Sequence, residues 1–249
     1  MIDPGDIDFY IVRENNEGEY SSIGGKLYEG TAQELVVQES VFTRKGVDRV
    51  MKFAFELAAK RNNKLTSATK SNGIIHTMPY WDQRFKEMGK NYPQVALDQF
   101  HIDILCAHFV QHPDWFDVVV ASNLFGDILS DEAAVLTGSL GMLASATIGG
   151  KVDLYEPVHG SAPDIAGEGK ANPLGAIECV AMCLAQTGKH ILAAEAIRNG
   201  VQKVLVDGYR TADLTKNPQD REITTEEMGD LASRYSVEHA NFTHAYHAV

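Results

Sequence analysis

Apolar and polar positions form two kinds of pattern along this chain. Short apolar runs predict strands at residues 34–42, 65–69, 95–100, 116–121 and 152–155, and residues 5–12 predict a turn followed by a strand. Elsewhere apolar residues recur with the 3.6-residue period of an amphipathic helix. That period predicts helices over 44–60, 74–90, 101–111, 172–186 and 190–206, one more from residue 123, and a last short helix from Thr225. Strands that alternate with helices are typical of an α/β architecture.

The stretch from Ser122 to Asp131 stands out because it follows the apolar run at 116–121. Ser122 can cap the helix that comes next. Asp127 and Asp131 are four residues apart, so they share one face of that helix without a Lys or Arg between them. Two stacked carboxylates favour a hard divalent cation, Mg²⁺ or Mn²⁺. The alternative is a solvated acidic face without a ligand.

The amino-acid composition limits the kinds of partner that this protein can bind. The 249 residues carry a formal net charge of −12, which argues against nucleic acid and anionic membranes as partners. It suits a small anionic substrate that meets locally concentrated Arg, Lys and metal. No apolar run approaches membrane-spanning length. The three cysteines form no disulfide framework, which favours a cytoplasmic protein.

Other polar residues follow predicted strands, where α/β proteins place functional groups. Lys70 and Asn72 come after the strand at 65–69, and a lysine there can accept a hydroxyl proton. Arg13 and Tyr20 follow the first strand, where Arg suits a carboxylate and a tyrosine hydroxyl can donate a proton. Asp103 could be a third metal carboxylate or could complement a helix N-terminus. A surface lysine and a surface hairpin are the structural alternatives.

A second catalytic pattern also occurs. Ser67 to Lys70 matches the S-x-x-K motif of penicillin-interacting serine enzymes. The motif is short, and its S-D-N and K-T-G companions are absent from the sequence. We therefore discount a serine hydrolase.

The composition changes after Leu136. Glycines at 138, 141, 149 and 150 indicate loops or a crossing between domains. The loop at 156–167 is rich in small residues, and its Asp164 could accept hydrogen bonds from a ribose diol and repel a 2′-phosphate. The loop lacks G-x-G-x-x-G, so it is not a Rossmann fingerprint. Asn172 followed by Pro173 predicts a helix start.

Taken together, these stretches resemble the β-decarboxylating dehydrogenases, which include isocitrate, isopropylmalate and tartrate/D-malate dehydrogenases. The resemblance is carried, in the family's order, by residues 12–15 with Tyr20, Lys70 with Asn72, 123–131 and 156–172. It covers nearly the whole chain. Residues 38–44, 66–73 and 101–107 are most similar to the tartrate/D-malate branch, whereas 138–173 are equally similar to isopropylmalate dehydrogenases.

The resemblance implies an isopropylmalate dehydrogenase-like two-domain α/β fold. Residues 1–137 would form the smaller substrate, metal and dimerisation domain, and 138–249 the C-terminal half of the larger cofactor-binding domain. Family members begin with a further stretch that supplies the remaining strands of the larger domain. The resemblance therefore predicts a chain that lacks those strands, and a complementing N-terminal fragment as a candidate partner.

The resemblance also implies roles for single residues and a reaction. Arg13 and Asn72 would bind the substrate, Tyr20 would protonate the enolate, and Lys70 would take the hydroxyl proton. Asp103, Asp127 and Asp131 would hold Mg²⁺ or Mn²⁺. The adenosine half of NAD would contact His159, Gly160, Ser161, Ala162, Asp164, Ile165 and Asn172. The reaction would be NAD-dependent oxidation of a 2-hydroxy dicarboxylic acid such as D-malate, tartrate or isopropylmalate, with or without β-decarboxylation.

A homodimer follows, because in this family the lysine and the first aspartate reach into the neighbouring subunit's site. The competing interpretation is a non-catalytic dimerisation or assembly fragment, or one half of a split dehydrogenase.

Overall fold

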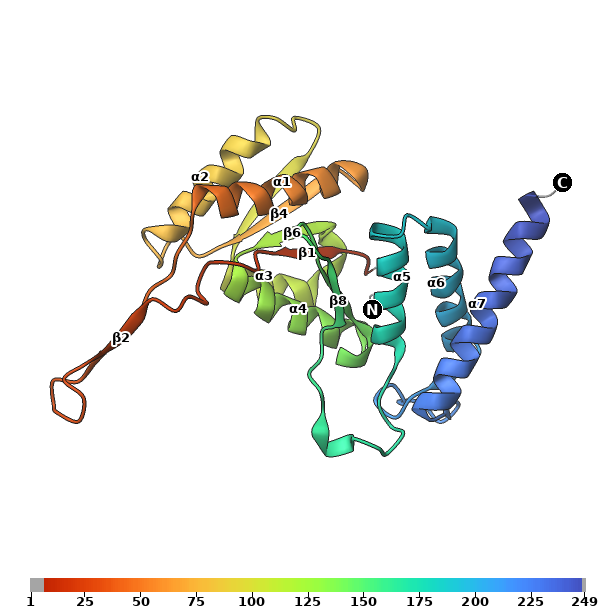
Figure 1. The fold of residues 1–249 in the computed structure, drawn as a ribbon. Coiled ribbons are helices and arrows are strands. Elements are labelled where there is room, and N and C mark those ends of the chain that lie inside the picture. The colour runs from red at the N-terminus through yellow and green to blue at the C-terminus, as the bar shows by residue number, and fades with distance from the viewer. Residues whose placement is uncertain (1–6, 248–249) are drawn as a thin grey trace. The chain divides into compact units, whose positions relative to one another are not determined.

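The computed structural model describes residues 7–247, and the chain forms two compact units, 1–133 and 134–249 (Figure 1). Positions 5 and 6 of the turn and strand predicted over 5–12 lie outside the described residues. The fold is mixed α/β with a parallel sheet, so the predicted fold class is confirmed.

The first unit is built on a four-stranded parallel sheet in the order β1-β6-β4-β5. Its strands are β1 (Tyr10–Arg13), β4 (Lys64–Thr69), β5 (Ala96–His101) and β6 (Val118–Ala121). All four residues of β6 are buried. Helices cover both faces of a parallel sheet, which explains the continuous apolar run of this inner strand.

Four helices belong to this sheet: α1 (Arg44–Lys60), α2 (Thr77–Gly89), α3 (Ile102–Gln111) and α4 (Asn123–Thr137). Figure 1 shows α1 and α2 on one side of the sheet and α3 with α4 on the other. The boundaries of α1 are those predicted, and the Thr43 hydroxyl caps it by accepting the Gly46 N–H at 3.1 Å. The predicted helix over 74–90 begins later, at Thr77.

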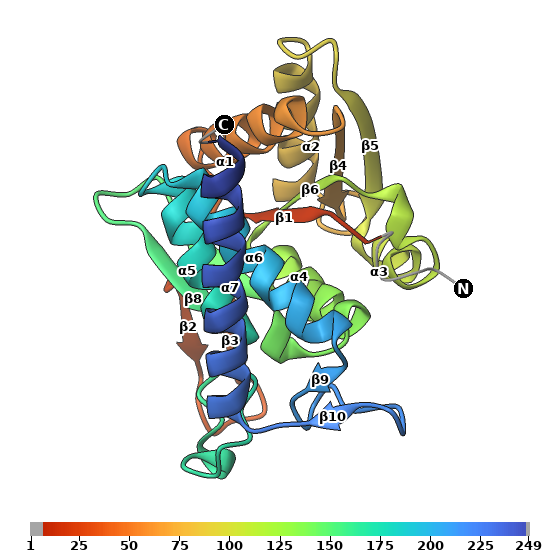
Figure 2. The same cartoon turned by 90° about the vertical axis from the view of Figure 1, so that its right-hand side faces the viewer.

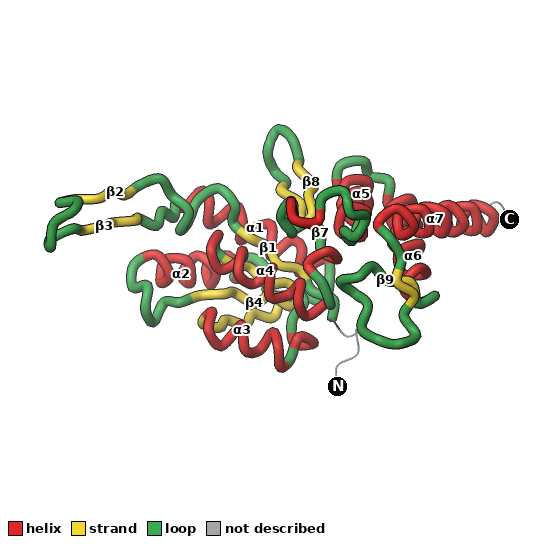
Figure 3. The backbone as a smooth tube through the Cα atoms, turned by 90° about the horizontal axis from the view of Figure 1, so that it is seen from below, coloured by secondary structure: helices red, strands yellow, loops and turns green. Residues whose placement is uncertain are grey.

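An antiparallel hairpin of β2 (Gly24–Leu27) and β3 (Leu35–Gln38) extends from the first unit (Figure 3). The single strand predicted over 34–42 was therefore too long, and its partner β2 was missed. Two of the four residues of β2 are glycines, so it has no apolar alternation to detect. Both strands are exposed along their whole length.

The second unit joins a small hairpin to three helices (Figure 2). Strands β7 (Ala144–Thr147) and β8 (Leu154–Pro157) pair antiparallel, and both contact α5 (Leu174–Gln186). Helix α6 (Ile191–Val206) packs between α5 and α7 (Thr225–His247). Two short strands, β9 (Tyr209–Arg210) and β10 (Arg221–Glu222), run parallel.

The last helix was predicted to be short, but α7 has 23 residues. Its Met228 and Ala232 are buried in one core with Leu174 and Val204. Docking on α6 therefore stabilises a helix whose own sequence is strongly polar. Within residues 7–247, none of the helices is long and apolar enough to cross a membrane.

Candidate active site

The carboxyl ends of the parallel strands carry most of the candidate residues. Arg13 is the last residue of β1, and Asn123 opens α4 two residues after β6 ends. Lys70 follows β4, and Asp103 lies in the first turn of α3 directly after β5. In open α/β sheets this edge is where ligands bind, so the topology supports a functional site here.

Arg13 is held against the start of α4. Its Nε and Nη2 donate to the Asn123 Oδ1 at 3.0 and 2.8 Å, and its Nη1 pairs with the Asp127 Oδ1 at 2.5 Å. The side chain crosses the helix over Gly126. A Cβ on that glycine would lie 2.6 Å from the Arg13 Cγ and 2.7 Å from its Cβ. Only glycine at 126 leaves room for this path.

Tyr20 reaches the same carboxylate. Its hydroxyl donates to the Asp127 Oδ2 at 3.3 Å, and the Arg13 guanidinium lies 5.9 Å from the centre of its ring. Desolvation, and then the Asp127 carboxylate, raise the pKa of this phenol above its usual 10.0, which keeps it protonated at neutral pH. The structure thus brings the Arg13 guanidinium and the Tyr20 phenol together with the Asp127 carboxylate, which lies 107 positions after Tyr20 in the chain.

Lys70 and Asp103 form a second pair. The Lys70 Nζ lies 2.7 Å from the Asp103 Oδ1, and this contact lowers the pKa of the Asp103 carboxyl. The two meet because β4 and β5 are parallel neighbours, with Thr69 paired to His101. Asn72 is exposed in the turn that follows Lys70.

The three predicted metal ligands are not gathered in one place. Asp103 is engaged with Lys70, whereas Asp127 is engaged with Arg13 and Tyr20. In the part of the chain that the structure describes, no three His, Cys, Asp or Glu side chains form a metal cluster. Asp127 and Asp131 on α4 are oxygen donors of the kind Mg²⁺ prefers, so one chain offers part of a donor set.

The S-x-x-K pattern has a structural explanation. Ser67 is fully buried in β4, and its hydroxyl accepts a hydrogen bond from the Trp81 Nε1 at 3.0 Å. A nucleophile must meet its substrate, and this hydroxyl cannot. The structure therefore agrees with discounting a serine hydrolase.

The predicted cofactor loop lies in the second unit. Gly160, Ser161, Ala162 and Asp164 are exposed, while His159 and Ile165 are half-buried. The His159 Nδ1 lies 2.8 Å from the carbonyl oxygen of Gly160, and Ala162 has a φ of 42°. A left-handed conformation is costly for a residue other than glycine and often marks a functional site. An exposed carboxylate among small residues suits a ribose diol.

Asn172 closes this loop, but its side chain points into the protein. It is 8% exposed, and its Oδ1 accepts the N–H of Leu174 at 3.0 Å at the start of α5. Its Nδ2 donates to the Asp213 Oδ2 at 3.0 Å. The helix begins at Leu174 with Pro173 at the N-cap, one position later than predicted, and Asn172 supplies a side-chain acceptor just before it.

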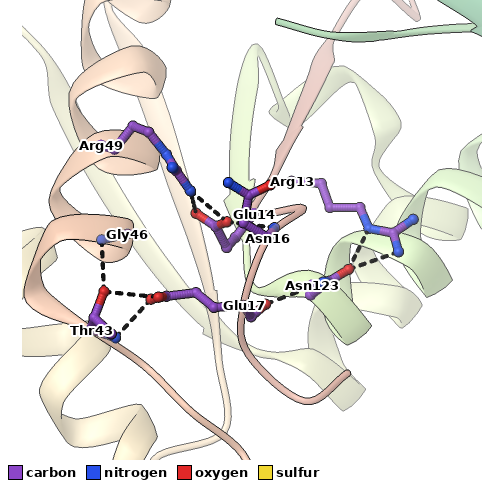
Figure 4. A network of polar contacts seen from close by, with 8 residues as sticks. All are labelled: Arg13, Glu14, Asn16, Glu17, Thr43, Gly46, Arg49 and Asn123. Atoms are coloured by element: carbon purple, nitrogen blue, oxygen red, sulfur yellow. Dashed lines mark hydrogen bonds and ion pairs between the residues drawn. The ribbon is translucent and has the colours of Figure 1, made fainter. Parts of the chain in front are cut away.

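Three glutamates between Arg13 and Tyr20 were not singled out from the sequence, and Figure 4 shows two of them, Glu14 and Glu17. Glu14 is 2% exposed and accepts two hydrogen bonds from the Arg49 Nη2, at 2.8 and 3.1 Å. Glu17 accepts the N–H and the hydroxyl of Thr43, at 2.7 and 2.8 Å. A run of acids directly after a strand was the available signal, but their partners lie in distant helices.

Glu19 corrects one prediction. Ser122 was expected to cap α4, but its hydroxyl donates to the Glu19 Oε1 at 2.7 Å. The Glu19 Oε2 accepts the N–H of Leu124 at 3.0 Å. The capping acceptor thus comes from the segment after β1, which no local pattern reveals.

A parallel sheet that carries polar and charged residues at its carboxyl edge is typical of α/β proteins that bind a ligand there. Residues 2–232 match the model of the isocitrate/isopropylmalate dehydrogenase family, and the chain belongs to that family. The resemblance stated from the sequence is therefore confirmed.

Several relatives are closely similar. D-malate dehydrogenase (decarboxylating) of Escherichia coli K12 is 54% identical over 86% of this chain. The tartrate dehydrogenase/decarboxylase of Pseudomonas putida is 52% identical over 84% of it. The isocitrate dehydrogenase structure from Methylococcus capsulatus superimposes with a TM-score of 0.84 at 36% identity, over 93% of this chain and 71% of that one. The matched region spans 62% of the first of these relatives and 60% of the second.

Proposed function

We propose that this chain carries the acid, base and metal residues of an NAD-dependent oxidation, with or without β-decarboxylation, of a 2-hydroxy dicarboxylic acid. D-malate, tartrate and isopropylmalate are the candidate substrates. The observation that carries the proposal is the convergence of Arg13 and Tyr20 on Asp127. The relatives named above act on D-malate and tartrate, which supports the same substrate class here.

Each residue has a role that its chemistry allows. Arg13 presents a planar cation that suits a substrate carboxylate, and Asn72, two residues after Lys70, is the second candidate for binding the substrate. Lys70 accepts the proton of the substrate hydroxyl as C2 is oxidised. After the carboxylate is lost as CO₂, Tyr20 returns a proton to the carbon it leaves, because a phenol carries its proton at neutral pH.

Two groups would be supplied from outside the chain. Asp127 and Asp131 from one copy, with Asp103 from a second copy, would hold Mg²⁺ or Mn²⁺, while His159 to Ile165 and Asn172 would flank the adenosine half of NAD. When bound, the metal polarises the oxidised C2 oxygen and NAD⁺ accepts the hydride. Among the described residues, no group of three candidate ligands gathers within one chain, which favours such sharing between two copies.

Two finer features belong to the same proposal. Asp164 favours NAD over NADP, because its carboxylate accepts ribose hydroxyls and repels a 2′-phosphate. The three free cysteines suit a reducing compartment such as the cytoplasm.

The test measures both the turnover of substrate and the binding of Mn²⁺. The purified chain is assayed for NAD⁺ reduction with D-malate, tartrate and isopropylmalate, with and without Mn²⁺, and Mn²⁺ binding is measured by electron paramagnetic resonance. Asp103→Asn and Asp127→Asn should each abolish tight Mn²⁺ binding. Mixing the two variants should restore about a quarter of the sites under random pairing, because only one site of each mixed dimer keeps both aspartates. Mixtures as empty as their parents, with subunit exchange confirmed, would refute the shared site.

A further inference from the structure

The segment from Arg13 to Tyr20 carries a proposed functional side chain at each end. Between them Gly18 has a φ of 108°, and it exchanges two backbone hydrogen bonds with Val41, at 2.8 and 2.9 Å. A Cβ on Gly18 would lie 3.3 Å from the Cβ of Asn123. The segment therefore passes close to the start of α4, in a conformation that favours glycine.

At the end of the segment next to Tyr20, the Glu19 carboxylate accepts two hydrogen bonds at the start of α4. One carboxylate oxygen takes the Ser122 hydroxyl at 2.7 Å and the other takes the Leu124 N–H at 3.0 Å. The first N–H groups of a helix have no partner within the helix, and a negative charge is stabilised at that end. A carboxylate that accepts both bonds is a charge-assisted cap, which is stronger than a neutral one.

Tyr20 is weakly held by its own side chain, although Ser21 after it donates to the carbonyl oxygen of Glu39 at 2.5 Å. The Tyr20 side chain is 54% exposed, and its hydroxyl contact with the Asp127 Oδ2 is long, at 3.3 Å. The residue directly before it, Glu19, is fixed to the first turn of the helix that carries Asp127. This carboxylate therefore connects the residue before Tyr20 directly to the helix that carries Asp127.

We propose that Glu19 is a positioning residue that keeps the Tyr20 hydroxyl in register with Asp127 by anchoring the Arg13–Tyr20 segment to the start of α4. The proposal deepens the proposed function and rests on it for the role of Tyr20 as proton donor. It assigns Glu19 no contact with the substrate.

The chain provides a matched control. Glu17 lies in the same segment, has the same charge and accepts a backbone N–H and a hydroxyl, but from Thr43 at the start of α1. Glu17→Ala removes a comparable cap from a different helix. Glu19→Gln is the conservative variant, because its amide can accept the Leu124 N–H and donate to the Ser122 oxygen.

The experiment follows Tyr20 in the full chain without added metal. The nine tyrosines are replaced by 3-fluorotyrosine, and Tyr20→Phe identifies the Tyr20 signal in the ¹⁹F NMR spectrum. Asp127→Asn defines the chemical shift of Tyr20 without its carboxylate partner. Glu19→Ala should move the signal most of the way to that value, whereas Glu19→Gln and Glu17→Ala should leave it near its wild-type position.

A Glu19→Ala chain that melts at a lower temperature with the Tyr20 signal unmoved would overturn the proposal and leave Glu19 as a stabilising cap only. Equal displacement by Glu17→Ala would also overturn it, because the segment would then loosen as a whole. The proposed function is tested separately, by measuring the turnover of D-malate by Tyr20→Phe. Wild-type turnover would refute Tyr20 as the proton donor and would leave the NMR result unchanged.

Discussion

Replacing Gly126 by alanine should be costly, although alanine is the better helix former. In a helix interior this change alone gains roughly 0.5–1 kcal/mol. Here the added Cβ would lie 2.7 Å from the Cβ of Arg13, which cannot rotate away because it is attached to the backbone of β1. Inserting a methyl group into such a contact costs about 1–3 kcal/mol. The net expectation is a loss of up to about 2.5 kcal/mol in the free energy of unfolding.

Gly229 in α7 provides the control. Among the described residues, no atom lies within 4 Å of a Cβ placed on it. Gly229→Ala should therefore gain the roughly 0.5–1 kcal/mol of helix propensity. Urea unfolding followed by circular dichroism gives both values, and the two variants should differ by about 1–3 kcal/mol. If Gly126→Ala stabilised the chain as much as Gly229→Ala does, the path of Arg13 across α4 would be refuted.

Three further predictions follow from other contacts. Gly200→Ala should lower the melting temperature, because its Cβ would lie 2.6 Å from the backbone nitrogen of Ser236 where α6 meets α7; an unchanged melting temperature would contradict that close approach. Burial opposes ionisation of Asp213, but hydrogen bonds from Ser139, Thr211 and Asn172 outweigh it and lower the pKa of the carboxyl below 3.8. The stability that this carboxylate contributes is therefore complete above pH 3.8 and is lost as the pH falls through the folded-state pKa. When the melting temperature is measured at a series of acidic pH values, it should fall less steeply with decreasing pH in Asp213→Asn than in the wild type. Burial raises the pKa of the Cys106 thiol to about 12, whereas Cys183 is exposed, so iodoacetamide at pH 8 should label Cys183 first when peptides are analysed by mass spectrometry.

The sequence predicts elements whose signal is local. Helix α1 shows this most clearly: Val47, Met51 and Ala54 recur on one face and are buried, and Thr43 caps the helix where its residue type predicts. The strand β6 is found because all four of its residues are buried. Local periodicity and capping chemistry suffice in these cases.

Features that depend on distant partners were not predictable in the same way. The order β1-β6-β4-β5 is set by pairing between strands far apart in the chain. The short strands β2 and β7 carry too few apolar residues to be recognised. The carboxylate of Glu19 replaces the expected cap from Ser122 because β1 lies beside β6 in the folded sheet. Candidate residues could be named from motifs, but their pairing as Arg13 with Asp127 and Lys70 with Asp103 required the structure.

The bond between Glu19 and Ser122 joins residues 103 positions apart, and β1 enters the sheet only beside β6. Closing a chain loop of that length costs about 4 kcal/mol of entropy before any contact is formed. During synthesis β1 leaves the ribosome long before β6 is made, so we expect β1 to remain unpaired until then. We therefore expect the Arg13–Asp127 contact to form late in the folding of this unit, and β6 to keep an unpaired edge until β1 joins it.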